Sequence, residues 1–305
     1  MTTAAHPTPA VRRWPSLKAA VELLKPVTWF APMWALGCGV VSSGIAILEH
    51  WPLVVFAALL AGPLVCGTSQ AANDWFDRHV DAINEPNRPI PSGRIPGRWG
   101  LYIAIGWTAL SLAVAALLGR WVFAAAVFGI ALAWAYSAPP FRLKKNGWWG
   151  NSAVGLCYEG LPWFTGAAAL STTLPNPPIL ALAALYSAGA FGIMILNDFK
   201  AVEGDIAMNV RTLPVQLGVD RAAHVACWVM AVPQVVVIGL LVYWGRLPHA
   251  AAIGVSLAVQ VFLMTRLVKQ PRERAAWYNA TGTTLYVTGM MIAAFAVRTL
   301  ANGGS

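Results

Sequence analysis

The sequence predicts an all-α, polytopic membrane protein in which nine transmembrane helices form one bundle. Of its 305 residues, 58% are hydrophobic and 11% are charged. An average soluble domain has about 45–50% apolar and about 25% charged residues. The 15 tryptophans suit the aromatic belts at membrane interfaces. These observations exclude an ordinary soluble enzyme.

The nine predicted spans are apolar stretches close to the roughly 20 residues that a membrane helix needs. They fall near 27–47, 52–72, 100–118, 120–137, 150–170, 178–198, 222–244, 249–268 and 277–299. Residues 27–300 are therefore expected to form a single membrane-embedded domain, and residues 1–26 an N-terminal segment outside the bilayer.

The N-terminal segment contains a predicted amphipathic helix. Trp14, Leu17, Val21 and Leu24 recur at helical spacing among charged residues. This pattern is typical of a short helix that lies on the membrane surface.

The distribution of Lys and Arg predicts the orientation of the chain. The basic N-terminus and the long links at 73–99, 138–149, 199–221 and 269–276 fall on one side of the predicted bundle. They hold most of the Lys and Arg residues that flank the spans. By the positive-inside rule these links and the N-terminus are cytoplasmic, and the C-terminus is outside. The formal net charge of +9 thus indicates topology rather than nucleic-acid binding.

An acidic motif closes the second predicted span. Asn73 and Asp74 are followed by Asp77 and Asp81. At 100° per residue, offsets of three and seven lie within about 60° of the start, so the three carboxylates are predicted to share one helix face. Carboxylates are costly near a bilayer, which favours a function over chance.

A similar motif closes the sixth predicted span. Asn197 and Asp198 are followed by Asp205, with Ala201 at the middle position, and Asp198 and Asp205 are predicted to share a face. The recurrence four helices later indicates a weak internal repeat, with two four-helix halves and a ninth helix. Duplications of this kind commonly place a substrate site between the halves.

Two facing acidic clusters suit hard divalent cations that hold a diphosphate. Mg²⁺ prefers oxygen ligands and usually binds through one or two carboxylates and phosphate oxygens. The predicted ligands of two Mg²⁺ ions, which are also the predicted catalytic residues, are Asp74, Asp77, Asp81, Asp198 and Asp205, with Glu203 as a further candidate. The predicted diphosphate-binding residues are Asn73, Arg88, Arg142, Lys144, Asn197, Lys200 and Arg211.

With two Asp-rich motifs on helices two and six of nine, the chain resembles the UbiA-type intramembrane prenyltransferases over roughly residues 20–300. The resemblance implies a helical bundle with a cavity open to the membrane, two Mg²⁺ ions and an allylic prenyl diphosphate donor. The first motif is intact. The second has Ala201 where many relatives have Asp, which leaves Asp198, Glu203 and Asp205 as carboxylates.

Further segments resemble one branch of that family, the chlorophyll and bacteriochlorophyll synthases. These segments are LKPVTWF at 24–30, CGVVSSG at 38–44, NEPNRPIPSG at 84–93, NDFKAVEGD at 197–205 and VRTLPVQLG at 210–218. No long Ser/Arg-rich extension precedes them, which favours the bacterial members, in an inner or intracytoplasmic membrane. The resemblance implies that a geranylgeranyl or phytyl group is transferred from its diphosphate to the propionate of bacteriochlorophyllide or, alternatively, chlorophyllide.

Other functions remain open from the sequence. An enzyme of the same superfamily could attach a prenyl chain to an aromatic quinone precursor, although the segments after each acidic motif argue against it. A transporter would place its polar residues at mid-membrane depth in broken helices. A pigment-binding protein without enzymatic activity would need neither acidic motif.

Overall fold

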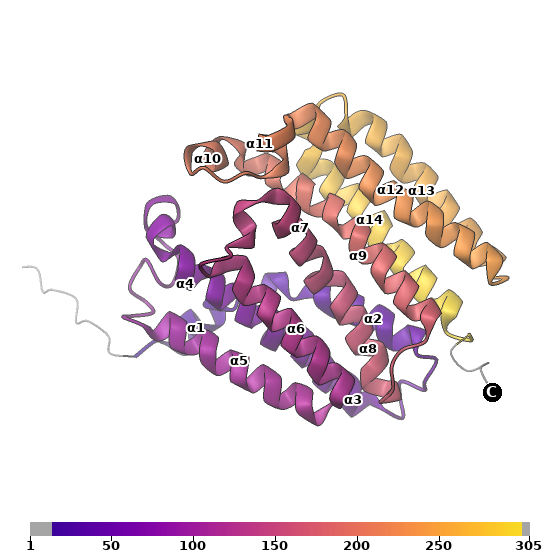
Figure 1. Cartoon of the computed structure of the whole chain (residues 1–305), viewed down its shortest axis with the longest axis horizontal. Coiled ribbons are helices and arrows are strands. Elements are labelled where there is room, and N and C mark those ends of the chain that lie inside the picture. The colour runs from indigo at the N-terminus through magenta and orange to yellow at the C-terminus, as the bar shows by residue number, and fades with distance from the viewer. Residues whose placement is uncertain (1–13, 301–305) are drawn as a thin grey trace, which may run out of the picture.

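A computed structural model of the protein describes residues 14–300, and these residues are all-helical (Figure 1). Arg12, Arg13 and residues 301–305, on which part of the predicted topology depends, lie outside the described residues.

The first part of the chain contains a series of helices that ends near the middle of the sequence. They are α1 (Leu17–Leu23), η1 (Pro26–Thr28), α2 (Phe30–Ser42), α3 (Trp51–Leu59), η2 (Leu60–Cys66), α4 (Gly67–Asn84), α5 (Trp99–Leu117), α6 (Arg120–Ser137), η3 (Leu143–Lys145), α7 (Gly147–Gly155), η4 (Leu156–Gly160) and α8 (Leu161–Ser171).

The second part continues the bundle with longer helices. They are α9 (Pro177–Asp198), η5 (Phe199–Ala201), α10 (Val202–Ala207), α11 (Leu213–Leu217), α12 (Val219–Tyr243), α13 (Leu247–Leu267) and α14 (Pro271–Val297).

Within residues 14–300, seven helices are long and apolar enough to cross a membrane. They are Trp51–Asn84, Trp99–Leu117, Arg120–Ser137, Pro177–Ala207, Val219–Tyr243, Leu247–Leu267 and Pro271–Val297. Each of them contains most or all of a predicted span. Of the two other predicted spans, the first corresponds to α2, which has 13 residues. The other corresponds to α7, η4 and α8, which follow one another without a break.

Two segments, η2 and η4, are π-helical, and both adjoin a proline. Pro63 lies inside η2 and Pro162 follows η4. A proline has no N–H to donate and disturbs the α-helical ladder, so the backbone must adjust locally. The carbonyl of Pro63 accepts a hydrogen bond of 3.1 Å from Trp107 Nε1, which ties η2 to α5. Such π segments are frequent at functional sites.

The interior of the bundle is formed by close helix packing around a few large side chains. Trp163 stacks on Tyr186, and Tyr286 lies edge-on to Tyr186. These three residues belong to the largest buried apolar cluster, which also includes residues of α2, α12 and α13. Gly39 on α2 faces the backbone of α8, and Gly166 on α8 faces the backbone of α2, so small residues permit the close approach.

A short helix, α1, is present in the predicted N-terminal segment. Ala19, Leu23 and Leu24 pack against Ala71 and Ala72 of α4. Leu17 and Val21 are exposed. Because α1 packs on α4, the chain that enters α2 begins beside the first acidic motif.

The helix ends that follow the two acidic motifs lie toward one end of the bundle. In Figure 1 the end of α4 and the short helices α10 and α11 all lie toward the left of the view. The arrangement brings together chain segments that are more than a hundred residues apart.

Candidate functional site

The first acidic motif occupies one continuous helix, as predicted. Asp74, Asp77 and Asp81 all lie in α4. Asp74 is 1% exposed and Asp81 is 7% exposed, whereas Asp77 is half-buried. Two buried carboxylates on one helix are costly unless they are paired, so their partners define the site.

Basic side chains from three other segments pair with these carboxylates. Lys25 Nζ lies 2.7 Å from Asp74 Oδ1. Arg88 Nη1 lies 3.2 Å from Asp74 Oδ1 and 2.9 Å from Asp81 Oδ2. Lys144 is hydrogen-bonded to Asp77. Positive charge is therefore concentrated beside the first motif, as an anion-binding site requires.

The surroundings of Lys144 and Arg88 shift the pKa values of these two side chains. Burial lowers the pKa of the Lys144 ammonium, although the charge of Asp77 opposes this effect. Burial also acts to lower the pKa of Arg88, but the hydrogen bond that Arg88 donates to Glu85 and the charges of Asp74 and Asp81 raise it overall. Arg88 thus stays a cation, as guanidinium groups do in proteins.

The second motif spans a change of helix type. Asp198 is the last residue of α9, and the 3₁₀ helix η5 separates it from α10, which contains Asp205. Asp198 Oδ2 accepts a hydrogen bond of 3.1 Å from Asn151 Nδ2 of α7. Asp205 is 8% exposed, and its Oδ2 accepts a hydrogen bond of 3.0 Å from Thr212. Each of these two carboxylates therefore accepts a hydrogen bond from a different neutral side chain.

Glu203, the additional candidate ligand, lies on the exposed side of α10. Its carboxylate is 2.9 Å from Arg272 Nη1 at the start of α14, and both side chains are largely exposed. The structure therefore brings Glu203 to α14 rather than to Asp198.

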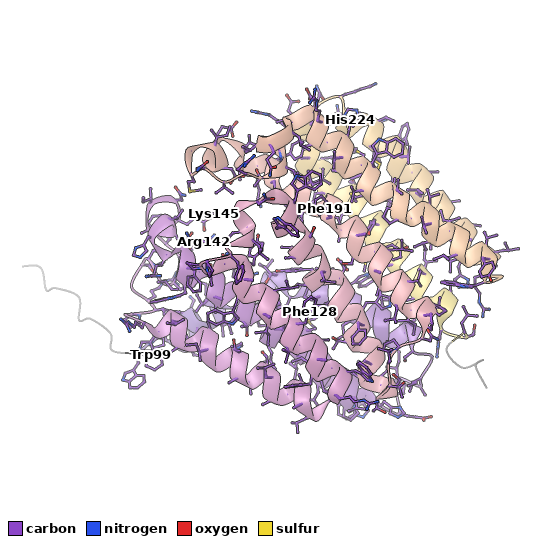
Figure 2. All side chains as sticks on the ribbon, in the orientation of Figure 1. Trp99, Phe128, Arg142, Lys145, Phe191 and His224 are labelled. Carbon is purple, nitrogen blue, oxygen red and sulfur yellow. The ribbon has the colours of Figure 1, made fainter. Side chains whose placement is uncertain are left out.

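The predicted diphosphate-binding residues fall into two groups. Arg142 Nη2 donates to the carbonyl of Phe76 at 3.2 Å, so Arg142 and Lys144 both lie against α4. Lys200 and Arg211 are exposed, and they lie near the second motif. Figure 2 shows Arg142 and Lys145 at the end of the bundle where α4 ends.

The loop that carries Lys144 is joined to the loop that follows α10. Arg211 N donates to Lys145 O at 2.9 Å, and Gly147 N donates to Arg211 O at 2.8 Å. This short bridge between Asn146 and Arg211 is parallel. The bridge therefore links the loop that carries Lys144, the partner of Asp77, to the loop that follows the second motif.

A cavity of about 310 Å³ lies between the two motifs and is lined by a residue from each. Asn73 of α4 and Asn197 of α9 both line it, together with Tyr136, Tyr158 and Met194. The rest of its wall is Ser69, Gln70, Leu132, Ala133, Ala153, Val154 and Cys157. The asparagines of the two acidic motifs therefore face a common space of mixed polar and apolar character.

The two asparagines are held differently. Asn73 Nδ2 donates to Ser137 Oγ at 3.2 Å, which leaves its amide oxygen available as an acceptor or ligand. Asn197 Oδ1 accepts a hydrogen bond of 2.8 Å from Asn279 of α14, and Thr283 donates in turn to Asn279 Oδ1 at 2.9 Å. The second asparagine is thus oriented by the last helix.

The donor set fits Mg²⁺, although no metal cluster is formed in advance. Asp74 Oδ2 is buried and has no hydrogen-bond partner among residues 14–300. In the same part of the chain, no three His, Cys, Asp or Glu side chains lie close enough together to hold an ion. Mg²⁺ sites use one or two carboxylates and complete their coordination with water and phosphate oxygens, so a three-carboxylate cluster is not required.

Four residues of the site escaped the sequence reasoning. Lys25, Asn151, Thr212 and Asn279 contact Asp74, Asp198, Asp205 and Asn197. Lys25 precedes the first span and was assigned to the amphipathic helix. Asn151 and Asn279 lie within apolar runs, where a neutral amide gives no charge signal. A search for polar side chains inside predicted spans would have found both.

Comparison with known proteins identifies the family. The sequence profile of the UbiA prenyltransferase family matches residues 26–298. The chain is 60% identical to a bacteriochlorophyll synthase 33 kDa chain of Cereibacter sphaeroides, over 95% of this chain and 96% of that protein. It is 55% identical to the corresponding protein of Rhodobacter capsulatus, with the same coverage.

The fold agrees with a solved structure of the same family. A UbiA homolog from Archaeoglobus fulgidus, bound to DMAPP and Mg²⁺, superimposes with a TM-score of 0.69 at 20% sequence identity. The match covers 88% of this chain and 99% of that chain. The chain therefore belongs to the UbiA prenyltransferase family and is a multi-pass membrane enzyme.

Proposed function

We propose that this chain is a bacteriochlorophyll synthase, which esterifies the propionate of bacteriochlorophyllide with a geranylgeranyl or phytyl group. The observation that carries the proposal is the shared cavity between the two acidic motifs, lined by Asn73 and Asn197. The likeness over nearly the whole chain to proteins of that name supports the choice of acceptor.

In the proposed reaction the allylic C–O bond of the prenyl diphosphate breaks, and its electron pair leaves with the diphosphate. A propionate oxygen of the ring then forms the new C–O bond. The propionate is already ionised at neutral pH, so the reaction needs no dedicated general base. The absence of a histidine from the lining of the shared cavity agrees with this.

The basic residues stabilise the negative charge that develops on the leaving diphosphate. Lys25, Arg88 and Lys144 already lie at 2.7–3.2 Å from the carboxylates of α4 or in direct hydrogen-bond contact with them. A diphosphate placed here would offer these cations more negative charge than the carboxylates do. Preorganised cations of this kind stabilise the charge that develops on a leaving group.

Two Mg²⁺ ions complete the proposal for the site. One ion would be held by Asp74, Asp77 and Asp81, and the other by Asp198 and Asp205, with the oxygen of Asn73 as a neutral ligand. When bound, Mg²⁺ supplies electrostatic stabilisation of the diphosphate oxygens. The protein's own contribution is to hold these oxygen donors on two separate helices and to supply the surrounding cations.

The apolar wall of the cavity protects the reaction from water. Leu132, Ala133, Val154 and Met194 line it beside the two tyrosines. An allylic cation would be captured by water if water could reach it, so the apolar lining favours transfer to the ring carboxylate.

We also propose nine spans, with the N-terminus in the cytoplasm and the C-terminus outside. On this reading α2 and the continuous helix of α7, η4 and α8 cross the bilayer in addition to the seven long helices. An odd number of spans agrees with the distribution of Lys and Arg among the links. Residues 27–300 would then form one domain of two four-helix halves and a ninth helix.

The experiment incubates purified protein with bacteriochlorophyllide and with chlorophyllide, each with geranylgeranyl or phytyl diphosphate, with and without Mg²⁺. The proposal expects a Mg²⁺-dependent ester of bacteriochlorophyllide. Preferential esterification of chlorophyllide would identify a chlorophyll synthase instead. Prenylation of an aromatic quinone precursor, with no ester of either ring, would overturn the proposal.

A further inference from the structure

A second cavity adjoins the one between the acidic motifs. Ser69, Ala133, Cys157 and Tyr158 line both cavities, so the two spaces share a wall. The second is narrower, about 50 Å³ against about 310 Å³. We call this second space the slot. Cys66 and Tyr158, which lie on the two π-helical segments, stand beside the junction.

The slot leads away from the acidic end of the bundle. On α6, the lining residues follow one face of the helix from Tyr136 through Ala133 and Gly129 to Ala125. Tyr136 and Ala125 are eleven positions apart, so at 1.5 Å per residue this face spans about 16 Å. On the facing wall, the lining residues run from Asn73 to Leu60, or about 20 Å. The two adjoining cavities therefore follow α6 and the facing wall from the acidic end toward the opposite end of the bundle.

The far part of the slot is apolar. Leu60, Ala61, Ala125, Ala126 and Leu161 line it. One turn further along α6, Val122 is fully buried in the same apolar cluster as Leu60 and Ala61. A narrow apolar space beside the proposed diphosphate site suits a prenyl tail, whereas a wide, flat ring would not fit.

Gly129 lies at mid-depth on the α6 face and differs from the packing glycines of the bundle. A Cβ at Gly39 or Gly166 would meet the backbone of a neighbouring helix. At Gly129 it would meet Leu161 Cδ1, the end of a flexible side chain, at 3.3 Å, and no backbone within 4 Å. Glycine inside a helix costs about 1 kcal/mol relative to alanine. Gly129 thus faces a side chain of the slot, Leu161, rather than the backbone of another helix.

We infer that Gly129, opposite Leu161, sets how far a prenyl chain enters the slot and so determines which donor length the enzyme accepts. This inference rests on the proposed function, because it assumes a prenyl diphosphate held at the acidic site. A larger side chain at Gly129 would fill the slot halfway along its depth. Short chains would still bind, and long chains would be excluded.

The test compares geranyl, farnesyl and geranylgeranyl diphosphate, each one isoprene unit longer than the one before. Gly129→Leu should lower the ratio of kcat/KM for the geranylgeranyl donor to that for the geranyl donor by at least roughly tenfold, which is the discrimination expected from steric exclusion in an apolar pocket. Gly129→Ala should lower the ratio less. Leu161→Ala, which widens the slot, should raise it.

The matched control is Gly106→Leu. Gly106 lies on the exposed side of α5 and has nothing within 4 Å of its Cβ position. This variant should leave the ratio unchanged. An equal loss for all donors in Gly129→Leu, or an unchanged ratio, would overturn the inference. If Gly129→Leu does not fold, opposite shifts in Gly129→Ala and Leu161→Ala support the inference, and their absence overturns it.

The ratio is measured with whichever acceptor the wild-type protein esterifies or prenylates. Failure of the wild type with bacteriochlorophyllide would therefore count against the proposed function, and an unchanged donor ratio against the role of Gly129.

Discussion

Lys25 Nζ lies 2.7 Å from Asp74 Oδ1. This ion pair joins the segment that precedes α2 to a buried carboxylate of the first acidic motif. The pair joins residues 49 positions apart. It means that the N-terminal segment contributes directly to the acidic site. We therefore expect Lys25 to be a further diphosphate-binding residue.

Lys25→Met should raise the KM for the prenyl diphosphate on the order of tenfold, equivalent to about 1.4 kcal/mol, because a cation near the leaving group is lost. Steady-state kinetics with varied donor measures the effect. Lys18→Met is the control, since Lys18 is exposed on α1. Equal KM values for the two variants would remove Lys25 from the site.

Asp74→Asn and Asp198→Asn should each lower turnover on the order of 100-fold or more, because each removes a charged oxygen ligand from one of the two proposed ion sites. Asp220→Asn, an exposed change at the start of α12, should leave turnover near that of the wild type. Gel filtration in detergent checks folding. Near-normal activity in either of the first two variants would contradict the two-ion site.

Arg88→Lys and Arg211→Lys should both weaken use of the prenyl diphosphate more than binding of the ring. Lysine cannot reproduce the planar fork with which arginine holds phosphate oxygens. The loss should be larger for Arg88, which contacts Asp74 and Asp81, than for the exposed Arg211. Donor kinetics and fluorescence titration of chlorophyllide separate the two effects. Lost ring affinity with normal donor kinetics would contradict the role of that arginine.

Reporter fusions at residues 145 and 305 should lie on opposite sides of the membrane. The first falls in a basic link predicted to be cytoplasmic, and the second at the C-terminus beyond the ninth proposed span. Alkaline phosphatase and green fluorescent protein fusions give the complementary readouts. The same side for both positions would mean an even number of spans between them.

Gln234→Leu should destabilise the protein by about 1–2 kcal/mol. Gln234 and Gln260 are fully buried and donate to each other across α12 and α13 at 3.1 and 3.0 Å. The single change leaves the amide of Gln260 without this partner. The double change to Leu should cost less. Thermal unfolding in detergent measures both, and a larger loss in the double variant would contradict the pairing argument.

The sequence predicted the helical fold and the first acidic motif well, for a physical reason. Long apolar runs have one stable conformation in a bilayer, and the spacing of Asp74, Asp77 and Asp81 follows directly from helix geometry. The second motif was less predictable, because η5 interrupts the helix between Asp198 and Asp205. A 3₁₀ turn is set by tertiary contacts rather than by a local pattern.

Partners across the site were also hidden from the sequence. Asn151 and Thr212 are neutral, and nothing in their local sequence links them to a carboxylate. The sequence predicts an amphipathic helix on the membrane surface, and its pattern does not reveal that Ala19 and Leu23 also pack against α4. Contact with a neighbouring helix depends on shape as well as on polarity.

The π segment η2 determines which way the acidic end of its helix faces. It lies between Trp51, where the helix begins, and Asp74. One residue more or fewer in a helix turns everything beyond it by about 100°. Removing a single residue from η2, with every carboxylate kept, would therefore rotate Asp74 away from Lys25 and Asp77 away from Lys144. The number of residues in η2 therefore sets the rotation of α4 about its axis, and the acidic site forms at one value of that rotation only.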